Sequence, residues 1–271
     1  MTAGRKLRFA LSKTKLRVLV TRYRHRDIAP SDVFIASYPR SGSTWLRFVL
    51  QEVLTGLPSS FQKVNEQIPR VGFHERAYRL ADGGRVIQTH EAFRPEYKRA
   101  VYLVRDPRDV LLSEFAYQKA LGQMTDRLDS YVNLFVRGEL SRYGSWRDHA
   151  ASWLDASRAN ERIRIVRFED LRKDTEAAVR AILEFLGVHA QPEAIRAAVL
   201  DNTIDRMRAK ELKEPQAASK RGEFVRSGQA GGWRKSLGPE HARVIESWSE
   251  DILRRLDYPL AEKAAGDMAV R

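Results

Sequence analysis

The residues best suited to chemistry follow an apolar run that ends at Ser37. The stretch YPRSGSTW (residues 38–45) leads directly into an amphipathic helix pattern. A strand that turns tightly into a helix presents unpaired backbone N–H groups and the positive end of the helix dipole to one point. Gly42 allows close approach of the backbone, Arg40 adds a fixed positive charge, and three hydroxyl side chains add donors: Ser41, Ser43 and Thr44. This stretch therefore predicts a site for a phosphate-like anion.

The same loop differs from the ATP-binding loop of a kinase. That loop would read GxxxxGK[ST] and would place a hydroxyl and an Asp around magnesium, whereas residues 38–45 contain neither the second Gly nor the Lys. A small-molecule kinase that uses ATP and magnesium shares the strand-loop-helix arrangement and is one alternative. A plain turn with a Ser or Thr cap is the structural alternative.

Two other segments contain candidate residues. In YLVRDPRDVLLSEF (102–115), Arg105 leaves the end of an apolar run and Ser113 follows on the next helix, so both can reach one phosphate. A structural ion pair between Arg105 and Asp109 is the alternative. His90 follows the run RVIQ, and its ordinary pKa of about 6.5 suits a general base. A hydrogen-bonded structural histidine is the alternative there.

The stretch YPRSGSTW resembles the 5′-phosphosulfate loop of sulfotransferases that use 3′-phosphoadenosine 5′-phosphosulfate (PAPS). Further segments resemble the same family in the same order: YLVRDPRDVLLSEF, then GSWRDHAASW with VRFEDLRKDTEAAVRAILEFLG, and finally VRSGQAGGW (225–233). The resemblance covers about residues 32–237. It implies an α/β fold with a phosphosulfate loop that resembles a P-loop, and it implies PAPS as co-substrate without a metal.

The resemblance also implies which residues contact the nucleotide. Trp45 would stack on adenine, Phe168 replaces the family's Tyr, and Ile204 replaces its usual Phe. The late motif implies that Arg226 contacts the 3′-phosphate, and Arg221 is the alternative residue for this contact. The full implied set is Arg40, Ser41, Gly42, Ser43, Thr44, Trp45, Arg105, Ser113, Phe168, Ile204, Arg226, Ser227 and Gly228.

The implied reaction is in-line transfer of a sulfuryl group from PAPS to a hydroxyl or amine of an acceptor. VIQTHEAF resembles the family's Lys-Thr-His segment, which makes His90 the general base and leaves Glu91 as the rival base. Gln88 stands where the family often has a second catalytic Lys, so Arg40 would stabilise more of the leaving-group charge, with Ser113 beside it. The acceptor itself is not readable, and we expect a small alcohol, a phenol, a carbohydrate or a glycolipid.

The elements that must position these residues alternate along the chain. Short, nearly continuous apolar runs at 32–37, 85–88, 100–105 and 163–168 predict strands buried on both faces of a parallel sheet. Helical patterns lie between them, from Thr44 to Gly56, after Pro107, and after Gly238-Pro239, and in SWRDHAASWLDAS and DTEAAVRAILEFLG. We therefore expect an α/β fold with a central parallel sheet flanked by helices.

The domain organisation follows from the same pattern. We expect a basic arm at residues 1–30, one domain at 31–260 and a tail at 261–271. The polar stretch at 210–232 is long for a connector and predicts a lid or binding loop.

The chain of 271 residues has a net charge of +13 and a pI of about 10.1, which indicates an anionic partner. A basic nucleic-acid-binding protein is the remaining alternative. It would show exposed aromatic residues among basic ones, but Trp146, Trp153 and Trp248 fall on core stripes, so we expect no nucleic-acid partner. The absence of Cys excludes disulfides and thiolate metal sites.

The N-terminal segment contains nine Lys or Arg and no acid within residues 1–26. We expect a solvated arm, with peripheral contact to an anionic membrane as the alternative. No apolar stretch approaches the roughly 20 residues that span a bilayer, so the sequence predicts a cytoplasmic protein, either free or membrane-peripheral.

Overall fold

A sheet of four parallel strands forms the centre of the protein in a computed structural model, which describes residues 15–122, 127–214 and 228–260. The strands are β1 (Val33–Ser37), β2 (Val86–Thr89), β3 (Arg99–Val104) and β4 (Ile163–Arg167), in the spatial order β2-β1-β3-β4. Every residue of β1, β2 and β3 is buried. Apolar strands of this kind require cover on both faces, as parallel sheets generally do.

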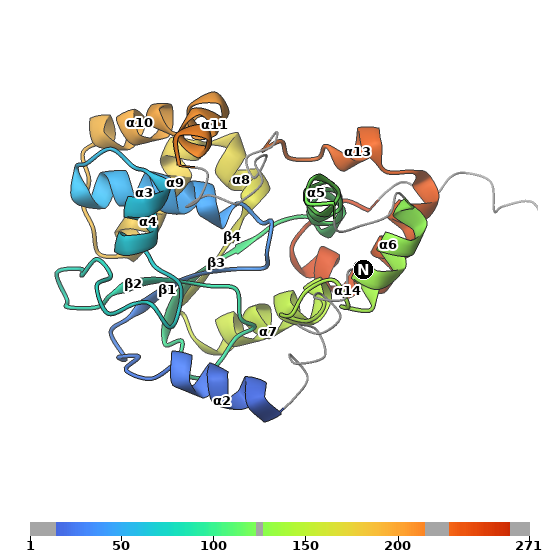
Figure 1. The fold of residues 1–271 in the computed structure, drawn as a ribbon, viewed down its shortest axis with the longest axis horizontal. Helices are drawn as coiled ribbons and strands as arrows, with labels where there is room; N and C mark the ends of the chain where they lie inside the picture. The colour runs from blue at the N-terminus through green and yellow to red at the C-terminus, as the bar shows by residue number, and fades with distance from the viewer. Residues whose placement is uncertain (1–14, 123–126, 215–227, 261–271) are drawn as a thin grey trace, which may run out of the picture.

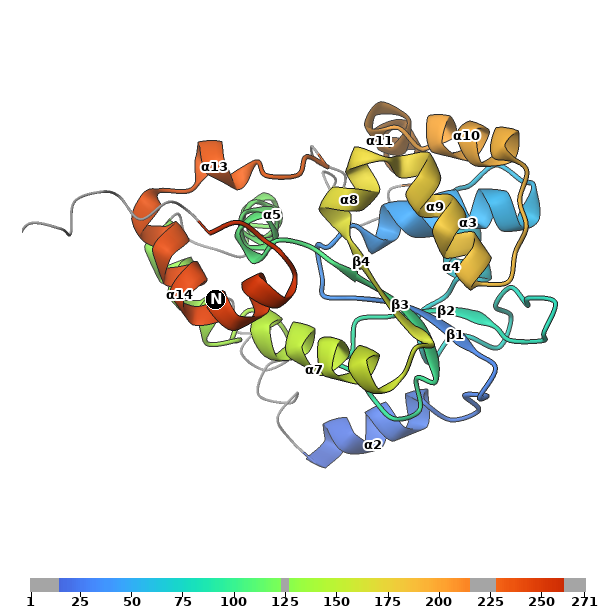
Figure 2. The same ribbon diagram turned by 180° about the vertical axis from the view of Figure 1, so that it is seen from behind.

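Helices supply this cover (Figure 1). On one side of the sheet lie α3 (Ser43–Thr55), α4 (Phe61–Gln67), α8 (Phe168–Lys173), α9 (Thr175–Phe185), α10 (Pro192–Asp201) and α11 (Ile204–Lys213). On the other side lies α7 (Trp146–Ala159), with α2 (Lys15–Arg24) further out, as Figure 2 shows from behind. A third group packs at the end of the sheet: α5 (Pro107–Ala120), α6 (Leu128–Val136), α13 (Trp233–Ser236) and α14 (Pro239–Arg255). The resulting layers are those of an α/β fold.

The alternation of side chains along the strands divides the core into two clusters. Val33 and Ile35 of β1 point into the cluster formed with α3, α9 and α10. Phe34 and Ala36 point into the cluster formed with α7 and α14. Because successive side chains of a strand face opposite sides, one short apolar segment contributes to both clusters.

The predicted elements are confirmed, with ends that differ by one or two residues. The predicted helix from Thr44 is α3, which begins at Ser43 and ends before Gly56, whose φ of 68° only glycine adopts without strain. The helix predicted after Pro107 is α5, where the Asp106 side chain caps the N-terminus by accepting a hydrogen bond from the Arg108 N–H.

The N-terminal expectation is wrong in part. Residues 15–24, expected to belong to a frayed, solvated arm, form the helix α2, although most of its described side chains are exposed to solvent. Arg24 donates to the carbonyl oxygen of Val71 at 2.7 Å, and His25 Nε2 is 2.6 Å from the Tyr97 hydroxyl, so polar contacts fix the end of this helix to the body. Residues 1–14 and 261–271 lie outside the described residues, and so does most of the predicted lid, of which residues 210–213 belong to α11.

The strand order reverses direction between β1 and β3. The chain leaves β1 to reach β2 on one side, whereas β3 and β4 lie on the other side. In open parallel sheets, ligands bind outside the carboxyl ends of the strands at such a switch point. The segments that follow β1 and β3, with Arg40 and Arg105, flank it here. Within the described ranges, no helix has the length and apolar character to cross a bilayer.

Candidate functional site

The loop after β1 has an unusual backbone. Arg40 has a φ of 69° and Gly42 a φ of 96°, both in the left-handed region. This conformation is strained for Arg, and it ends at Gly42, the N-cap of α3. No side chain caps this helix, so its first backbone N–H groups have no intrahelical partner and face the loop. The backbone of this turn therefore has the conformation that the predicted anion-binding loop requires.

Gly42 is required for a second reason. A Cβ atom at this position would lie 2.6 Å from two ring carbons of Phe168, which follows β4. The buried Phe168 ring thus packs directly against the loop backbone. The Arg105 guanidinium lies over the same ring, 4.7 Å from its centroid. Phe168, which follows β4, therefore contacts residues that follow β1 and β3.

Arg105 fixes the loop from the end of β3. Its side chain donates to the carbonyl oxygen of Arg40 at 3.2 Å and to that of Gln229 at 2.8 Å. Asp109 lies 3.9 Å from Arg105 Nη2, a longer separation than a hydrogen-bonded pair. Burial lowers the pKa of Arg105 from its ordinary value. The alternative in which Arg105 serves only an ion pair with Asp109 is not favoured by this geometry.

Ser113 and Arg40 are brought together. Arg40 Nε donates to Ser113 Oγ at 3.2 Å, and the guanidinium lies 4.5 Å from the centre of the Tyr117 ring. Both contacts come from α5. The helix therefore holds the Arg40 side chain beside the loop.

Two buried polar atoms at this point have no hydrogen-bond partner among the described residues. They are Ser41 Oγ, whose residue is fully buried, and Arg105 Nε, whose residue is 8% exposed. Buried donors are normally satisfied. Of these two residues, Arg105 lines the cavity, and its unpaired Nε–H beside the uncapped helix N–H groups fits an anionic group such as a phosphosulfate or a phosphate.

A cavity of about 370 Å³ opens at this edge of the sheet, a size typical of small-molecule sites. Most of the predicted residues line it: Arg40, Gly42, Ser43, Thr44, Trp45, His90, Arg105, Ser113, Phe168, Ile204 and Gly228. Ser41 is not part of its wall. Arg226 and Ser227, and the fallback Arg221, lie outside the described residues.

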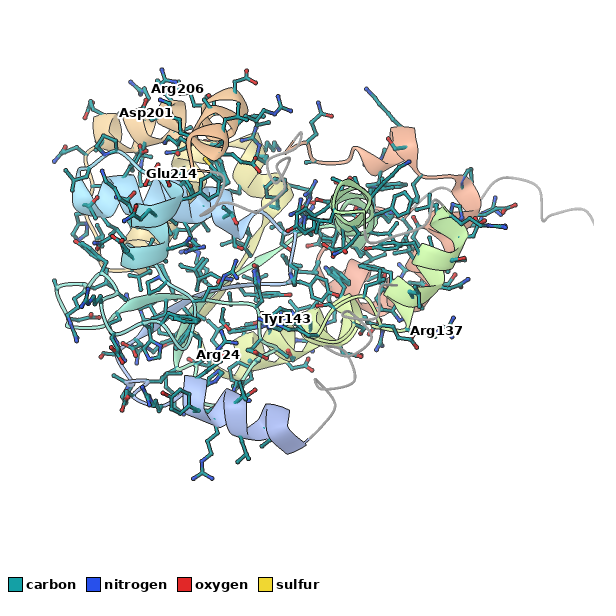
Figure 3. All side chains as sticks on the ribbon, viewed as in Figure 1. Arg24, Arg137, Tyr143, Asp201, Arg206 and Glu214 are labelled. Carbon is teal, nitrogen blue, oxygen red and sulfur yellow. The ribbon has the colours of Figure 1, made fainter. Side chains whose placement is uncertain are left out.

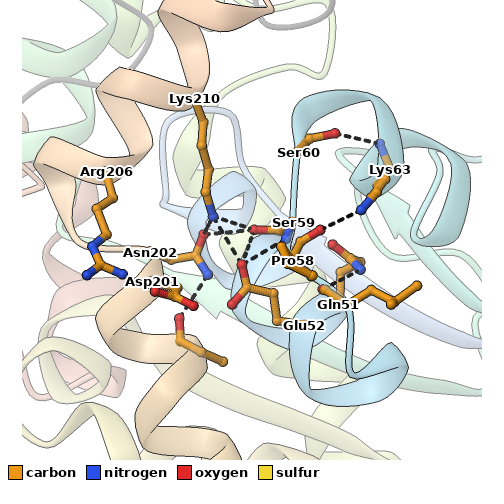
Figure 4. Close-up of polar contacts among 12 residues, drawn as sticks. Gln51, Glu52, Pro58, Ser59, Ser60, Lys63, Asp201, Asn202, Arg206 and Lys210 are labelled. Carbon is orange, nitrogen blue, oxygen red and sulfur yellow. Dashed lines mark hydrogen bonds and ion pairs between the residues drawn. The ribbon is translucent and has the colours of Figure 1, made fainter.

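A polar network fixes the wall of this cavity near Trp45 (Figure 4). Lys210 of α11 donates to Glu52 Oε1 of α3 at 3.0 Å, to Ser59 Oγ at 2.7 Å and to Asn202 Oδ1 at 2.8 Å. The backbone oxygen of Asn202 accepts a hydrogen bond from Trp45 Nε1 at 2.7 Å. The network therefore sets both the Trp45 ring and the start of α11, where Ile204 lines the cavity.

His90 has a defined tautomer. Its Nδ1 lies 2.8 Å from the carbonyl oxygen of Ser37, which can only accept a hydrogen bond. Nδ1 therefore carries the proton, and Nε2 retains its lone pair. Burial lowers the pKa of His90 to about 3, and the charge of Arg70 adds to this effect. The imidazole is thus neutral and able to accept a proton at neutral pH.

A second histidine holds the backbone of the first. His149 is 1% exposed, and its Nε2 donates to the carbonyl oxygen of His90 at 3.0 Å. The other nitrogen, Nδ1, is 3.0 Å from the Tyr102 hydroxyl. Burial lowers the pKa of His149 to about 4. Both nitrogens of His149 have partners, so it acts as a support for His90.

The two other residues considered for catalysis lie apart from the cavity wall. Gln88 is 1% exposed, and its side-chain amide has no partner among the described residues. It lines a small recess together with Glu91, and this recess shares Arg70, His90 and Tyr143 with the cavity.

Sequence reasoning missed several residues of the site. Asp109 accepts hydrogen bonds from the backbone N–H groups of Gly231 at 2.7 Å and Trp233 at 2.9 Å. It therefore holds residues 228–233, which we call the late glycine segment, against α5. Burial raises the pKa of its carboxyl. The missed lining residues are Pro39, Arg70, Glu114, Tyr117, Arg142, Tyr143, Arg172 and Met207. Pro39, Glu114 and Arg172 belong to segments whose motifs could have indicated them. No group of His, Asp or Glu among the described residues has the arrangement of a metal site.

Comparison with known proteins identifies related chains. Residues 30–263 match the family described as "Sulfotransferase domain". Human Sulfotransferase 2B1 is 30% identical over 246 residues, which cover 83% of this chain and 66% of the human protein. The 3-alpha-hydroxysteroid sulfotransferase of Cavia porcellus is 28% identical over 239 residues, which cover 81% of this chain and 82% of that protein. The crystal structure of mouse sulfotransferase SULT7A1 complexed with PAP has the same fold, with a TM-score of 0.70 at 21% identity over 92% of this chain and 91% of the mouse chain.

Proposed function

The chain belongs to the sulfotransferase domain family, and we propose that it transfers the sulfuryl group of PAPS to a hydroxyl group of a small-molecule acceptor. The observation that carries the proposal is one cavity that contains the N-terminus of α3, Arg40, Arg105 and His90. The bound PAP in the mouse SULT7A1 structure supports the choice of nucleotide.

The residues of the cavity divide into three roles toward this nucleotide. The backbone N–H groups at the start of α3, with Arg40, bind the 5′-phosphosulfate. Arg105 binds the 3′-phosphate, assisted by Ser113. Trp45, Phe168 and Ile204 contact the adenine. Ser41, Gly42, Ser43 and Thr44 complete the loop, and Arg226, Ser227 and Gly228 complete the phosphate contacts.

When bound, PAPS supplies an activated sulfuryl group whose bond to the bridging oxygen of the 5′-phosphate breaks as the new sulfur–oxygen bond forms. His90 accepts the proton of the acceptor hydroxyl at Nε2. The Ser37 carbonyl, which already binds Nδ1–H, stabilises the imidazolium that results. Arg40 and the N–H groups of α3 stabilise the negative charge that develops on the leaving oxygen.

His90 is the preferred base over Glu91 because of its position. The ring of His90 lines the cavity beside the loop, whereas Glu91 lines only the adjoining recess. Gln88 is neutral and buried in that recess, so it does not replace the charge of a second Lys. Arg40 therefore stabilises the leaving group without that second cation.

The acceptor class is supported by the relatives. The Cavia porcellus relative is named a 3-alpha-hydroxysteroid sulfotransferase, which supports a small molecule with an alcohol group. A carbohydrate or glycolipid acceptor stays a prediction of the sequence.

Contact between the N-terminal segment and an anionic membrane is a separate proposal. Val18 and Leu19 of α2 are 66% and 62% exposed, and Arg22 lies in the last turn of the helix. Exposed apolar side chains beside basic ones suit a surface with anionic lipids. Sedimentation with vesicles that contain phosphatidylserine tests it, and equal binding to vesicles of phosphatidylcholine alone would contradict it.

The transfer activity is tested with ³⁵S-labelled PAPS and a panel of phenols, alcohols and amines. We expect labelled product from the wild type, no product from His90→Ala, and unchanged binding of adenosine 3′,5′-bisphosphate (PAP) by this variant. Phosphorylation of the panel by ATP with magnesium, in place of sulfuryl transfer, would favour the kinase alternative.

A further inference from the structure

The cavity has lining residues beyond those that we assign to the nucleotide. The loop, Arg105 and Phe168 form one region, and Trp45, Ile204 and Arg172 form its adenine end. Three other residues line the cavity, Arg70, Arg142 and Tyr143. We call these three residues the acceptor wall. Arg70 and Tyr143 also share a recess with His90. Since His90 Nε2 must meet the acceptor hydroxyl in the proposed reaction, the rest of the acceptor lies against this wall.

The acceptor wall has two positive charges and no acidic residue. Neither Arg70 nor Arg142 forms an ion pair within the part of the chain that the structure describes, whereas arginines such as Arg85, Arg99 and Arg108 do. Both side chains are exposed. The charge of Arg70 reaches His90, where it contributes to the lowered pKa. Glu114, on α5, is the one acid of the described cavity lining.

Arg70 is held at this place by the sheet. Its backbone forms a parallel bridge with Gln88 of β2, and paired residues of neighbouring strands share a face. Gln88 and His90 are two residues apart and share this face as well. Gln88 adds a buried amide without a partner in the recess that Arg70, His90 and Tyr143 also line. The recess therefore offers hydrogen-bond donors beside a cation.

Tyr143 and Arg142 complete the wall. The Tyr143 ring is 5.6 Å from the His90 ring, centre to centre, and the Arg142 guanidinium lies 4.7 Å from the centre of the Tyr143 ring. Tyr143 thus presents an apolar surface beside the base, with one arginine on it. Figure 3 shows Tyr143 at the middle of the molecule, while Arg137 lies far away near α6.

We propose that the acceptor is a hydroxyl compound that also contains an anionic group, a carboxylate, phosphate or sulfate, which Arg70 and Arg142 bind while Tyr143 packs on its scaffold. The anion does not react. It orients the hydroxyl toward His90, and the two arginines compensate its charge beside the anionic nucleotide. This inference rests on the proposed sulfuryl transfer and specifies its substrate class.

The test compares matched acceptors that differ only in charge. The probes are 4-hydroxyphenylacetate and its methyl ester, and a 3-hydroxy bile acid and its methyl ester, each with saturating ³⁵S-labelled PAPS. One charge-assisted contact predicts a kcat/KM about tenfold higher for each acid than for its ester. Equal values, or a preference for the esters, would overturn the inference while leaving the sulfuryl transfer intact.

Variants assign the preference to the acceptor wall. The double variant Arg70→Met with Arg142→Met should bring the ratio of acid to ester toward one, and Arg70→Lys should retain part of it. Arg137→Met is the matched control, because Arg137 is exposed and remote from the cavity, and it should keep the full ratio. A ratio that persists in the double variant would contradict the role of both arginines.

Two further outcomes are distinguishable. If PAP raises the melting temperature but none of the four probes is sulfonated, the acceptor class is wrong and the nucleotide site stands. If PAP does not bind, the proposed function itself fails. Binding of PAP by the double variant serves as the check that it folds.

Discussion

The protonation state of His90 can be tested directly by acidification. Its Nδ1 donates to the Ser37 carbonyl at 2.8 Å, and burial lowers its pKa to about 3. We expect the side chain to remain neutral, as the Nδ1–H tautomer, when the pH falls from 8 to 5. A histidine with the ordinary pKa of about 6.5 would become charged over this range.

The protonated fractions of a histidine with an ordinary pKa and of His90 differ enough at pH 5 to be measured. At pH 5 a histidine with an ordinary pKa of about 6.5 is about 97% protonated, whereas a histidine with a pKa of about 3 is about 1% protonated. The lowered value has physical causes that the structure names, first burial and then the positive charge of Arg70. Removal of that charge by Arg70→Met should therefore raise the pKa.

The assay is an NMR titration of ¹⁵N-histidine-labelled protein, with His90→Gln to assign the resonance. The two ring nitrogens should keep the distinct shifts of a neutral Nδ1–H imidazole down to pH 5. A midpoint near pH 6.5, or a proton on Nε2, would refute the reasoning, because Nε2 could then not accept the proton of an acceptor. Free imidazole in the same buffer serves as the reference for an ordinary titration.

Three other predictions follow from the same geometry. Gly42→Ala should destabilise the fold by about 1–2 kcal/mol for the left-handed φ alone and should weaken PAP binding by displacing Phe168, as measured by thermal melting and calorimetry; unchanged values would contradict the tight loop. Asp109→Asn should release the late glycine segment, with a cost of about 1–2 kcal/mol and faster limited proteolysis near residue 231; equal cleavage rates would argue against this anchor. His149 has a pKa of about 4 in the folded protein, below its value of about 6.5 in the unfolded chain. Between pH 7.5 and 5 the unfolded chain therefore binds a proton at His149 that the folded protein does not bind. The free energy of unfolding should fall by about 2 kcal/mol from this residue over that range. Urea unfolding of His149→Phe should show a correspondingly smaller loss, and an identical loss would contradict it.

Much of the fold could be predicted because the strands are apolar on both faces. A segment such as VFIAS can bury every side chain only inside a covered parallel sheet, and helix ends such as Gly56 and Pro107 are marked by residues with special backbone preferences. The N-terminal segment was harder. Its charges indicate solvation, whereas hydrogen bonds from Arg24 to the backbone of Val71 hold α2. Those partners are 47 residues apart in the chain, so no local pattern indicates them.

The same distinction applies to the site. Arg40, Arg105 and His90 could be predicted because each follows a strand, and the carboxyl ends of parallel strands meet at one edge. Arg70 and Tyr143 come from connections without a motif, so only the fold places them beside His90. The division into an arm at 1–30, a domain at 31–260 and a tail at 261–271 stays a prediction.

The most direct measurement of the central claim compares the binding of PAP and of adenosine 5′-monophosphate, which lacks the 3′-phosphate. Calorimetry on the wild type should show much tighter binding of PAP. Arg105→Met should remove most of this difference, and it should weaken PAP by a larger factor than the monophosphate, which loses only the support that Arg105 gives to the loop. If Arg105→Met weakens both nucleotides equally, or if the wild type does not distinguish them, Arg105 does not hold the 3′-phosphate and the proposed arrangement of the nucleotide is wrong.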